Sequence, residues 1–506
     1  MGNGAMGIGG TIIVFLYLIF MLCLGAFTSK KIKSASDFIV AGKSLGFWLF
    51  VMLILGSTTS GMTLLGVAGL GYIGGWPTFW EQIFVPLTCA VAIIIYGYKL
   101  YEVCKENNFL TLQDYLAYRF ESPKAMRVIS SIAVLTTSLI YLVGQYTAIA
   151  IVLKWLLGIP QTQALFIGAV IVVLYVLLGG LYAVSWTTLF QGFIIFFGVI
   201  IITPFVIKSA GGLSVINTTM ASIDPNLVMP FFPQQHPPYA GYAFATPLFL
   251  VSFFLLLALG LGSGPHIINN AIAVKEKRYF KWSPLVVFVM YIFIMYLIKI
   301  SGMAVRTLVV NGAVSLGKPD DALLVGVKYA LPQVSWALFA VVILSAVMST
   351  TDRLLLVIGS CIGWDFYKQI FRRDASDKQI TLISRIAVII FGTISFLLAI
   401  KPPALLAWLI WMGIGVMLTT FVVPVIAGLY WKRANRYGAI WSMVTGYVMS
   451  IIFGAYAQFV KPLPVHFSFF PFLIAVAVMV IVSSFTAKPS ENLIKTSHTG
   501  YFIREK

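Results

Sequence analysis

The chain has 506 residues, of which 60% are hydrophobic and only 10% are charged, and its mean hydropathy is +0.97. Soluble domains carry about 25% charged residues, so this composition excludes a chain that folds wholly in water. The formal net charge of +18 does not indicate nucleic-acid binding, because the basic residues lie in short loops between apolar runs. We therefore expect a lipid bilayer as the partner surface and no nucleic acid.

Thirteen apolar runs are candidate membrane spans, since a helix needs about 20 apolar residues to cross a bilayer. They begin near Ile12, Leu45, Thr78, Val128, Ala164, Leu189, Thr246, Pro284, Trp336, Thr381, Leu405, Ala439 and Phe467. About 25 of the 34 basic residues fall in alternate connections, which this bias places in the cytoplasm. An odd number of spans then puts the N-terminus outside and the C-terminus inside the cell membrane.

The second and seventh spans each contain a glycine-rich, polar segment at membrane depth. These segments are LGSTTSGMTLLG at 55–66 and LGLGSGP at 259–265, the latter including Gly262 and Pro265. Paired interruptions of this kind indicate a transport site, because unwound backbone in a bilayer must line a cavity or be buried in protein. Close packing on small residues is the alternative explanation. The two spans are five apart, so the half-units have opposite topology and predict an inverted repeat.

The ninth span carries polar residues on one helical face. Ala346, Ser349, Thr350 and Arg353 follow the spacing i, i+3, i+4, i+7, and Asp352 lies near the edge of that face. Hydroxyl and freed carbonyl oxygens are the hard ligands that a small alkali cation needs. Asp352 and Arg353 either take part in coupling and gating or neutralise each other.

At these residues the sequence resembles the sodium:solute symporter family, and the similarity covers nearly the whole chain. Five motifs occur in the family's order, at the expected places: DFIVAGKSLG at 37–46, TLQDYLAYRF at 111–120, GPHII at 264–268, AVMST at 346–350 and YWKRANRYG at 430–438. The resemblance is to bacterial and archaeal members of the proline, pantothenate and monocarboxylate type. It implies an all-α membrane protein with a LeuT-type core of two inverted five-helix repeats.

The resemblance also implies the ligands. It places Na+, the coupling ion, between spans two and nine, at the backbone oxygens of Gly56, Thr59 and Ala346 and the hydroxyls of Ser349 and Thr350. The positions that match the family's solute contacts are Ser60, Thr63, Gln82, Gln145 and Trp411. Relatives carry amino acids, carboxylates, sugars or vitamins, so the resemblance leaves the solute open.

The expected organisation follows from the spans and the repeats. Residues 1–30 hold a peripheral first helix, 44–207 the first repeat, 244–431 the second repeat, 438–487 two peripheral helices and 488–506 a cytoplasmic tail. We expect gating residues at Gly262, Pro265, Asp352 and Arg353.

The predicted function is sodium-coupled symport of a small polar organic solute by alternating access. The alternative is a proton-coupled or sodium-independent transporter that uses Asp352 and Arg353. A channel or a solute sensor is a weaker interpretation, because polar residues cluster mid-membrane and the tail after Lys488 is short. An enzyme is not expected, because the spans contain no paired catalytic acids and no Ser-His or His-Glu-x-x-His arrangement.

Overall fold

The computed structural model describes residues 8–29, 34–233, 245–401, 406–461, 463–497 and 499, and in this part of the chain regular structure is helical. The helices of the first half are α1 (Ile8–Ser29), α2 (Ala35–Val40), α3 (Phe47–Thr58), α4 (Val67–Gly74), α5 (Glu81–Val91), α6 (Tyr98–Glu106), α7 (Leu112–Arg119), α8 (Pro123–Leu157), α9 (Gln161–Ser209) and α10 (Gly212–Ile223).

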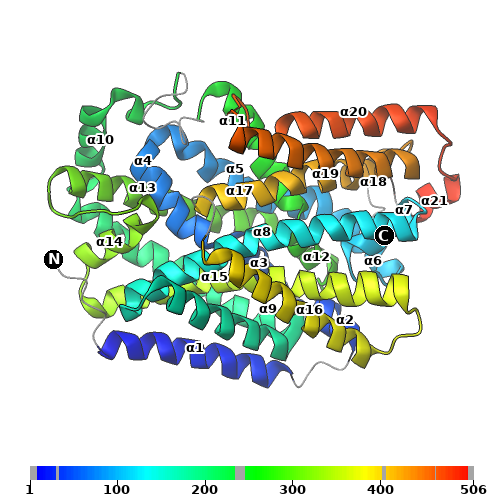
Figure 1. Ribbon diagram of the computed structural model, residues 1–506, viewed down its shortest axis with the longest axis horizontal. Coiled ribbons are helices and arrows are strands. Elements are labelled where there is room, and N and C mark those ends of the chain that lie inside the picture. The colour runs from blue at the N-terminus through cyan, green and yellow to red at the C-terminus, as the bar shows by residue number, and fades with distance from the viewer. Residues whose placement is uncertain are drawn as a thin grey trace.

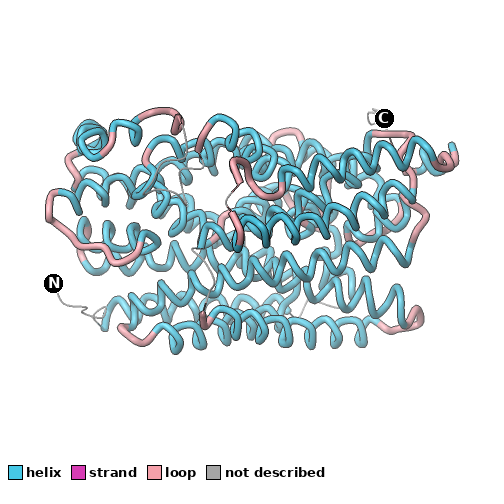
Figure 2. Tube along the Cα trace, turned by 45° about the horizontal axis from the view of Figure 1, so that its top comes forward, coloured by secondary structure: helices cyan, strands magenta, loops and turns pink. Residues whose placement is uncertain are grey.

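The second half continues the bundle. Its helices are α11 (Pro247–Phe254), α12 (Pro265–Ile272), α13 (Ser283–Val310), α14 (Ala322–Ala330), α15 (Gln333–Ser360), α16 (Asp377–Ala399), α17 (Leu406–Met417), α18 (Val423–Tyr430), α19 (Arg436–Phe459), α20 (Phe469–Phe485) and α21 (Glu491–Thr496). Most helices run side by side along the long axis, and most loops gather at the two ends (Figures 1 and 2).

The predicted spans correspond to helices, but their number is only partly reproduced. Nine described helices are long and apolar enough to cross a membrane, and two bent helix pairs raise the number to eleven. Two further predicted spans coincide with shorter apolar helices, Gln161–Leu174 and Phe469–Phe485. Thirteen therefore stays a prediction.

Two spans are broken where the sequence predicts it. Phe47–Thr58 meets Met62–Gly74 at 62°, and Pro247–Ser263 meets Pro265–Ile272 at 48°. In the first pair, Thr59 is extended, with φ −83° and ψ 109°. In the second pair, Gly264 is extended and is followed by a proline, which supplies no backbone N–H to continue the helix. At both sites an extended residue therefore ends one helix before the next begins.

The long helix α9 is really two helices. Gly180 lies within it at φ 50° and ψ −159°, conformations that non-glycine residues rarely adopt. A side chain at this position would also meet the ring of Phe38. The kink separates the predicted fifth and sixth spans.

The two ends of the bundle carry different loops. Helices α10 and α14 lie at one end, and α6, α7 and α21 lie at the other (Figure 1). This arrangement agrees with predicted extracellular and cytoplasmic loops on opposite sides, while the orientation in the membrane stays a prediction.

Close backbone contact between α4 and α13 depends on glycine. A methyl group on Gly302 would collide with the backbone of Ala68, and one on Gly71 would collide with the carbonyl of Lys299. Small residues allow this approach, and dispersion contacts then hold the two helices together.

We predict that Gly302→Ala lowers stability by about 1–3 kcal/mol, the usual cost of overpacking. The matched control is Gly317→Ala, because no atom lies within 4 Å of a methyl group there. Thermal unfolding in detergent should show a lower midpoint for Gly302→Ala only, and equal midpoints would contradict this packing.

Candidate functional site

The break in the second span meets α15 at a cluster of buried oxygens. The Thr350 hydroxyl lies within hydrogen-bond distance of the carbonyls of Gly56 (2.9 Å) and Thr59 (2.8 Å), which share its single hydrogen. The Ser349 hydroxyl likewise lies 3.0 Å from the carbonyl of Gly56 and, within its own helix, 3.0 Å from that of Ala346. The structure thus brings together all five residues that the resemblance assigns to sodium.

The chemistry of this cluster fits a small alkali cation. It consists of neutral oxygens, namely three carbonyls and two hydroxyls, and such oxygens can replace an ion's hydration shell. The Gly56 and Thr59 carbonyls lie at the C-terminal end of α3, where helix dipoles concentrate partial negative charge. Gly56 has no room for a side chain, because a methyl group there would meet Thr188 and Ser349.

Other groups freed by the same break are satisfied by predicted solute residues. The N–H of Ser60 donates to the Thr63 hydroxyl (3.0 Å), and the N–H of Gly61 donates to the Gln145 side-chain carbonyl (3.1 Å). Ser60, Thr63 and Gln145 therefore surround one break. Their contacts show that they stabilise the unwound backbone, whatever else they bind.

Tyr291 on α13 is a member of this group that sequence reasoning missed. Its hydroxyl donates to the carbonyl of Thr58 (2.6 Å) and lies 3.0 Å from the Thr63 hydroxyl. A tyrosine within an apolar run gives no distinctive signal, because aromatic side chains are common in such helices.

Gln82 and Trp411 have different surroundings. Oriented so that both its polar atoms find partners, the Gln82 amide donates to the carbonyls of Phe79 (3.0 Å) and Thr78 (3.2 Å). Trp411 is fully buried and packs edge-on against Phe253, with ring centroids 4.9 Å apart. Neither residue makes a described hydrogen bond to the break in the second span.

The predicted gating residues lie at the second break and beside the oxygen cluster. Arg353 donates from Nε and Nη2 to the carbonyl of His266 (3.4 and 3.3 Å), so it links α15 to α12. Pro265 is the first residue of α12, and Gly262 faces α5 at the backbone of Thr88. Asp352 is fully buried, and among the described residues it forms no ion pair with Arg353.

A buried acid–base pair lies at the start of α5. Lys299 on α13 donates to the hydroxyl of Thr78 (2.7 Å), and its Nζ lies 4.0 Å from Oε2 of Glu81. Both charged side chains are at most 1% exposed. Sequence reasoning missed this pair, although a single lysine inside the apolar run 283–310 is itself a functional signal.

We predict that Glu81→Gln destabilises the protein by about 3–5 kcal/mol, because it leaves a buried lysine without its counter-charge. The double variant Glu81→Gln/Lys299→Met should recover most of this loss, since it removes both charges. Thermal unfolding of both variants tests this, and a double variant no more stable than the single one would contradict the pairing.

Comparisons with known proteins identify the family. Residues 38–446 match the family model described as the sodium:solute symporter family. The osmoregulated proline transporter OpuE of Bacillus subtilis is 25% identical, over 97% of each chain. A sodium/pantothenate symporter of Haemophilus influenzae is 27% identical over 87% of this chain and 89% of its own. A sodium/proline symporter of Escherichia coli is 29% identical over 86% of each.

A solved structure shares the fold. It is a Na+-coupled sialic acid symporter in a substrate-bound, outward-open state, which superposes with a TM-score of 0.78 at 20% identity. The superposition covers 96% of this chain and 99% of that one. The family match, which spans most of the chain, confirms the resemblance seen in the motifs. The chain belongs to the sodium:solute symporter family.

Proposed function

We propose that this transporter works by alternating access, with Na+ held between the broken second span and α15. Sodium-coupled symport of a small solute follows from the family, in which Na+ is the coupling ion. The observation that carries the finer proposal is the cluster in which Ser349 and Thr350 meet the carbonyls of Gly56 and Thr59.

The proposed ion site joins two bodies that must move relative to each other. The Ser349 and Thr350 hydroxyls hold the freed carbonyls by neutral hydrogen bonds. A cation at the same oxygens interacts with their lone pairs more strongly than a neutral hydrogen bond does. It therefore favours the arrangement in which all five ligand oxygens converge. Coupling requires that Na+ binds one conformation more tightly than the other.

The membrane potential supplies part of the driving force. At 100 mV, inside negative, each inward-moving charge contributes about 2.3 kcal/mol, which corresponds to a concentration ratio of roughly fiftyfold. The binding energy of the ion determines which conformation is populated and does not itself drive accumulation of the solute.

The proposed solute site lies next to the first break. Ser60, Thr63 and Gln145 already provide polar atoms there, and Tyr291 closes the group from α13. Gln82 and Trp411 remain proposed solute contacts, supported only by their match to family positions. The solute is a small polar organic molecule, and proline and pantothenate, which the relatives' names specify, are the first to test.

The architecture supports two inverted repeats, at 44–207 and 244–431. The two bent spans are the second and seventh of the predicted spans. Backbone carbonyls near both bends accept hydrogen bonds from polar side chains, Thr59 from Thr350 and Leu259 from Tyr96. We further propose that the N-terminus is extracellular, the tail is cytoplasmic, and Arg353 and Asp352 take part in gating beside the ion site.

We predict that Thr350→Ala raises the Na+ concentration for half-maximal uptake about tenfold or more, because the substitution removes the Thr350 hydroxyl oxygen as a ligand of the cation. Uptake into proteoliposomes would be measured with a panel of labelled amino acids, carboxylates, sugars and vitamins, first to identify the solute and then to titrate Na+.

The matched control is Thr351→Ala. Thr351 is equally buried, but its hydroxyl donates to Val347 within α15 (2.6 Å) and not to the break. If Thr350→Ala and Thr351→Ala showed the same sodium dependence, the ion would not bind at this cluster.

A further inference from the structure

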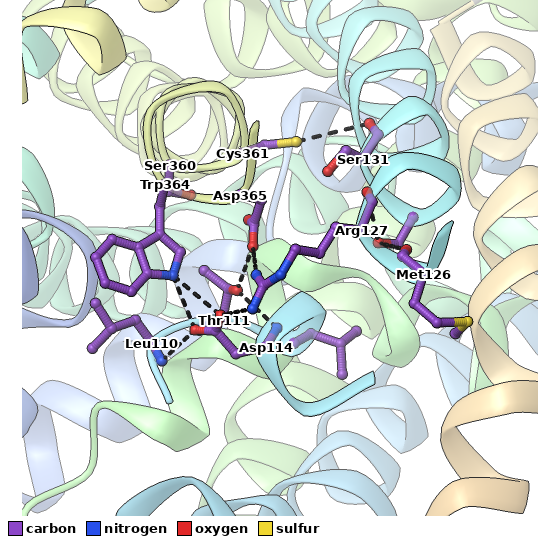
Figure 3. A network of polar contacts seen from close by, with 12 residues as sticks. Leu110, Thr111, Asp114, Met126, Arg127, Ser131, Ser360, Cys361, Trp364 and Asp365 are labelled. Atoms are coloured by element: carbon purple, nitrogen blue, oxygen red, sulfur yellow. Dashed lines mark hydrogen bonds and ion pairs between the residues drawn. The ribbon is translucent and has the colours of Figure 1, made fainter. Parts of the chain in front are cut away.

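Three charged side chains form a buried network at the end of the bundle that holds α7 (Figure 3). Arg127 at the start of α8 forms ion pairs with Asp114 of α7 (2.7 Å) and with Asp365 (2.8 Å). Asp365 belongs to η10 (Cys361–Phe371), the π-helical continuation of α15. One arginine therefore holds two carboxylates and joins three elements.

Hydrogen bonds from neutral donors to the same carboxylates strengthen this junction. Thr111 donates to Asp365 (3.0 Å), and the indole of Trp364 donates to Asp114 (3.1 Å). Asp114 also accepts the N–H groups of Leu110 and Thr111 at the start of α7. These contacts fix the first turn of α7 onto α8 and η10.

A second group of elements includes α6 and α12, which also contact α7. Leu45, just before α3, exchanges backbone hydrogen bonds with Ala273 and Lys275, which follow α12 (3.0 Å each). Lys277 forms an ion pair with Glu102 of α6 (2.6 Å). The start of α3 and the C-terminal ends of α6 and α12 are thus tied to one another.

At α7, one neutral hydrogen bond connects the two groups, in addition to the contacts of α15 with α3 and α12 described above. The N–H of Leu112, the first residue of α7, donates to the side-chain oxygen of Asn269 on α12 (3.0 Å). Asn269 is 3% exposed. A neutral bond of this kind contributes only about 0.5–1.5 kcal/mol net, whereas breaking a buried ion pair costs about 3–5 kcal/mol.

We propose that Asn269 is a positioning residue that holds the cytoplasmic side of the pathway closed. Asp114, Arg127 and Asp365 keep α7 in place on α8 and η10, and Asn269 latches α12 to α7. When α12 moves away with α3 and α6, the Leu112–Asn269 bond breaks and the ion pairs stay intact. This inference rests on the alternating-access proposal above.

The native thiols provide a test in the full-length protein. Cys104 is buried in α6, where its carbonyl accepts from Lys43 and from the N–H of Phe109, just before α7. It should become accessible when α6 and α12 leave α7. Cys361 is buried between η10 and α8, where its Sγ donates to Ser131, so its accessibility should not change.

Proteoliposomes would carry variants whose only cysteine is Cys104 or Cys361, and maleimide labelling would be timed with and without Na+. Without Na+, Asn269→Ala should label Cys104 about twofold to tenfold faster, the ratio expected for one lost neutral hydrogen bond. Asn269→Asp keeps an acceptor oxygen and should restore the parent rate. If Asn269→Ala does not fold, Asn269→Ser removes the same contact, because serine is too short to reach Leu112.

The matched control is Asn270→Ala. Asn270 is the next residue of α12, but it donates to Ser57 of α3 (3.1 Å), within the group that moves together. It should leave Cys104 labelling unchanged, and Cys361 labelling should be the same in every variant. If Na+ slows Cys104 labelling in the parent but Asn269→Ala labels at the parent rate, the latch is wrong. If Na+ has no effect on Cys104 in the parent, the sodium-biased alternating access beneath the latch is wrong.

Discussion

The structure depends on how the carbonyls freed by the break in the second span find partners at membrane depth. A bilayer offers no water for unwound backbone, so each exposed carbonyl or N–H must be satisfied from within the protein. Here Ser349 and Thr350 of α15 reach the carbonyls of Gly56 and Thr59, and Gln145 reaches the N–H of Gly61. In this conformation, contacts with α15 and α8 satisfy the backbone groups that the break frees.

That constraint links structure to function. A junction made of hydroxyls and carbonyls satisfies the backbone and is also composed of suitable ligands for a small cation. Under the proposal above, the same contacts that satisfy the backbone respond to sodium. The second break has a corresponding contact, because Arg353 of α15 donates to the carbonyl of His266 beside the extended Gly264. The helix α15 therefore contacts both interrupted spans.

The sequence predicted the parts of the fold that depend on local composition. The length of the apolar runs located the spans. Glycine-rich polar segments located both breaks, because residues that interrupt a helix act at their own position in the chain. The five residues proposed to bind sodium came from the resemblance, and the structure brings all five together. The number of spans is only partly reproduced, because apolar helices such as Phe469–Phe485 are shorter than the length expected of a membrane-spanning helix.

The contacts that sequence reasoning missed join residues far apart in the chain. Tyr291 lies 228 positions from Thr63, and Arg127 lies 238 positions from Asp365. Single tyrosines, arginines and aspartates in such segments look alike until the fold pairs them. Glu81 and Lys299 are a partial exception, since a charged residue within an apolar run is itself a functional signal, although only the fold identifies its partner.

The most direct test of this account is a crystal structure of the protein in which Tl+ replaces Na+. Anomalous scattering would locate the ion without any knowledge of the solute. The account predicts a single strong peak enclosed by the carbonyls of Gly56, Thr59 and Ala346 and the hydroxyls of Ser349 and Thr350. A peak elsewhere with none at this cluster, for example beside Asp352, would contradict it.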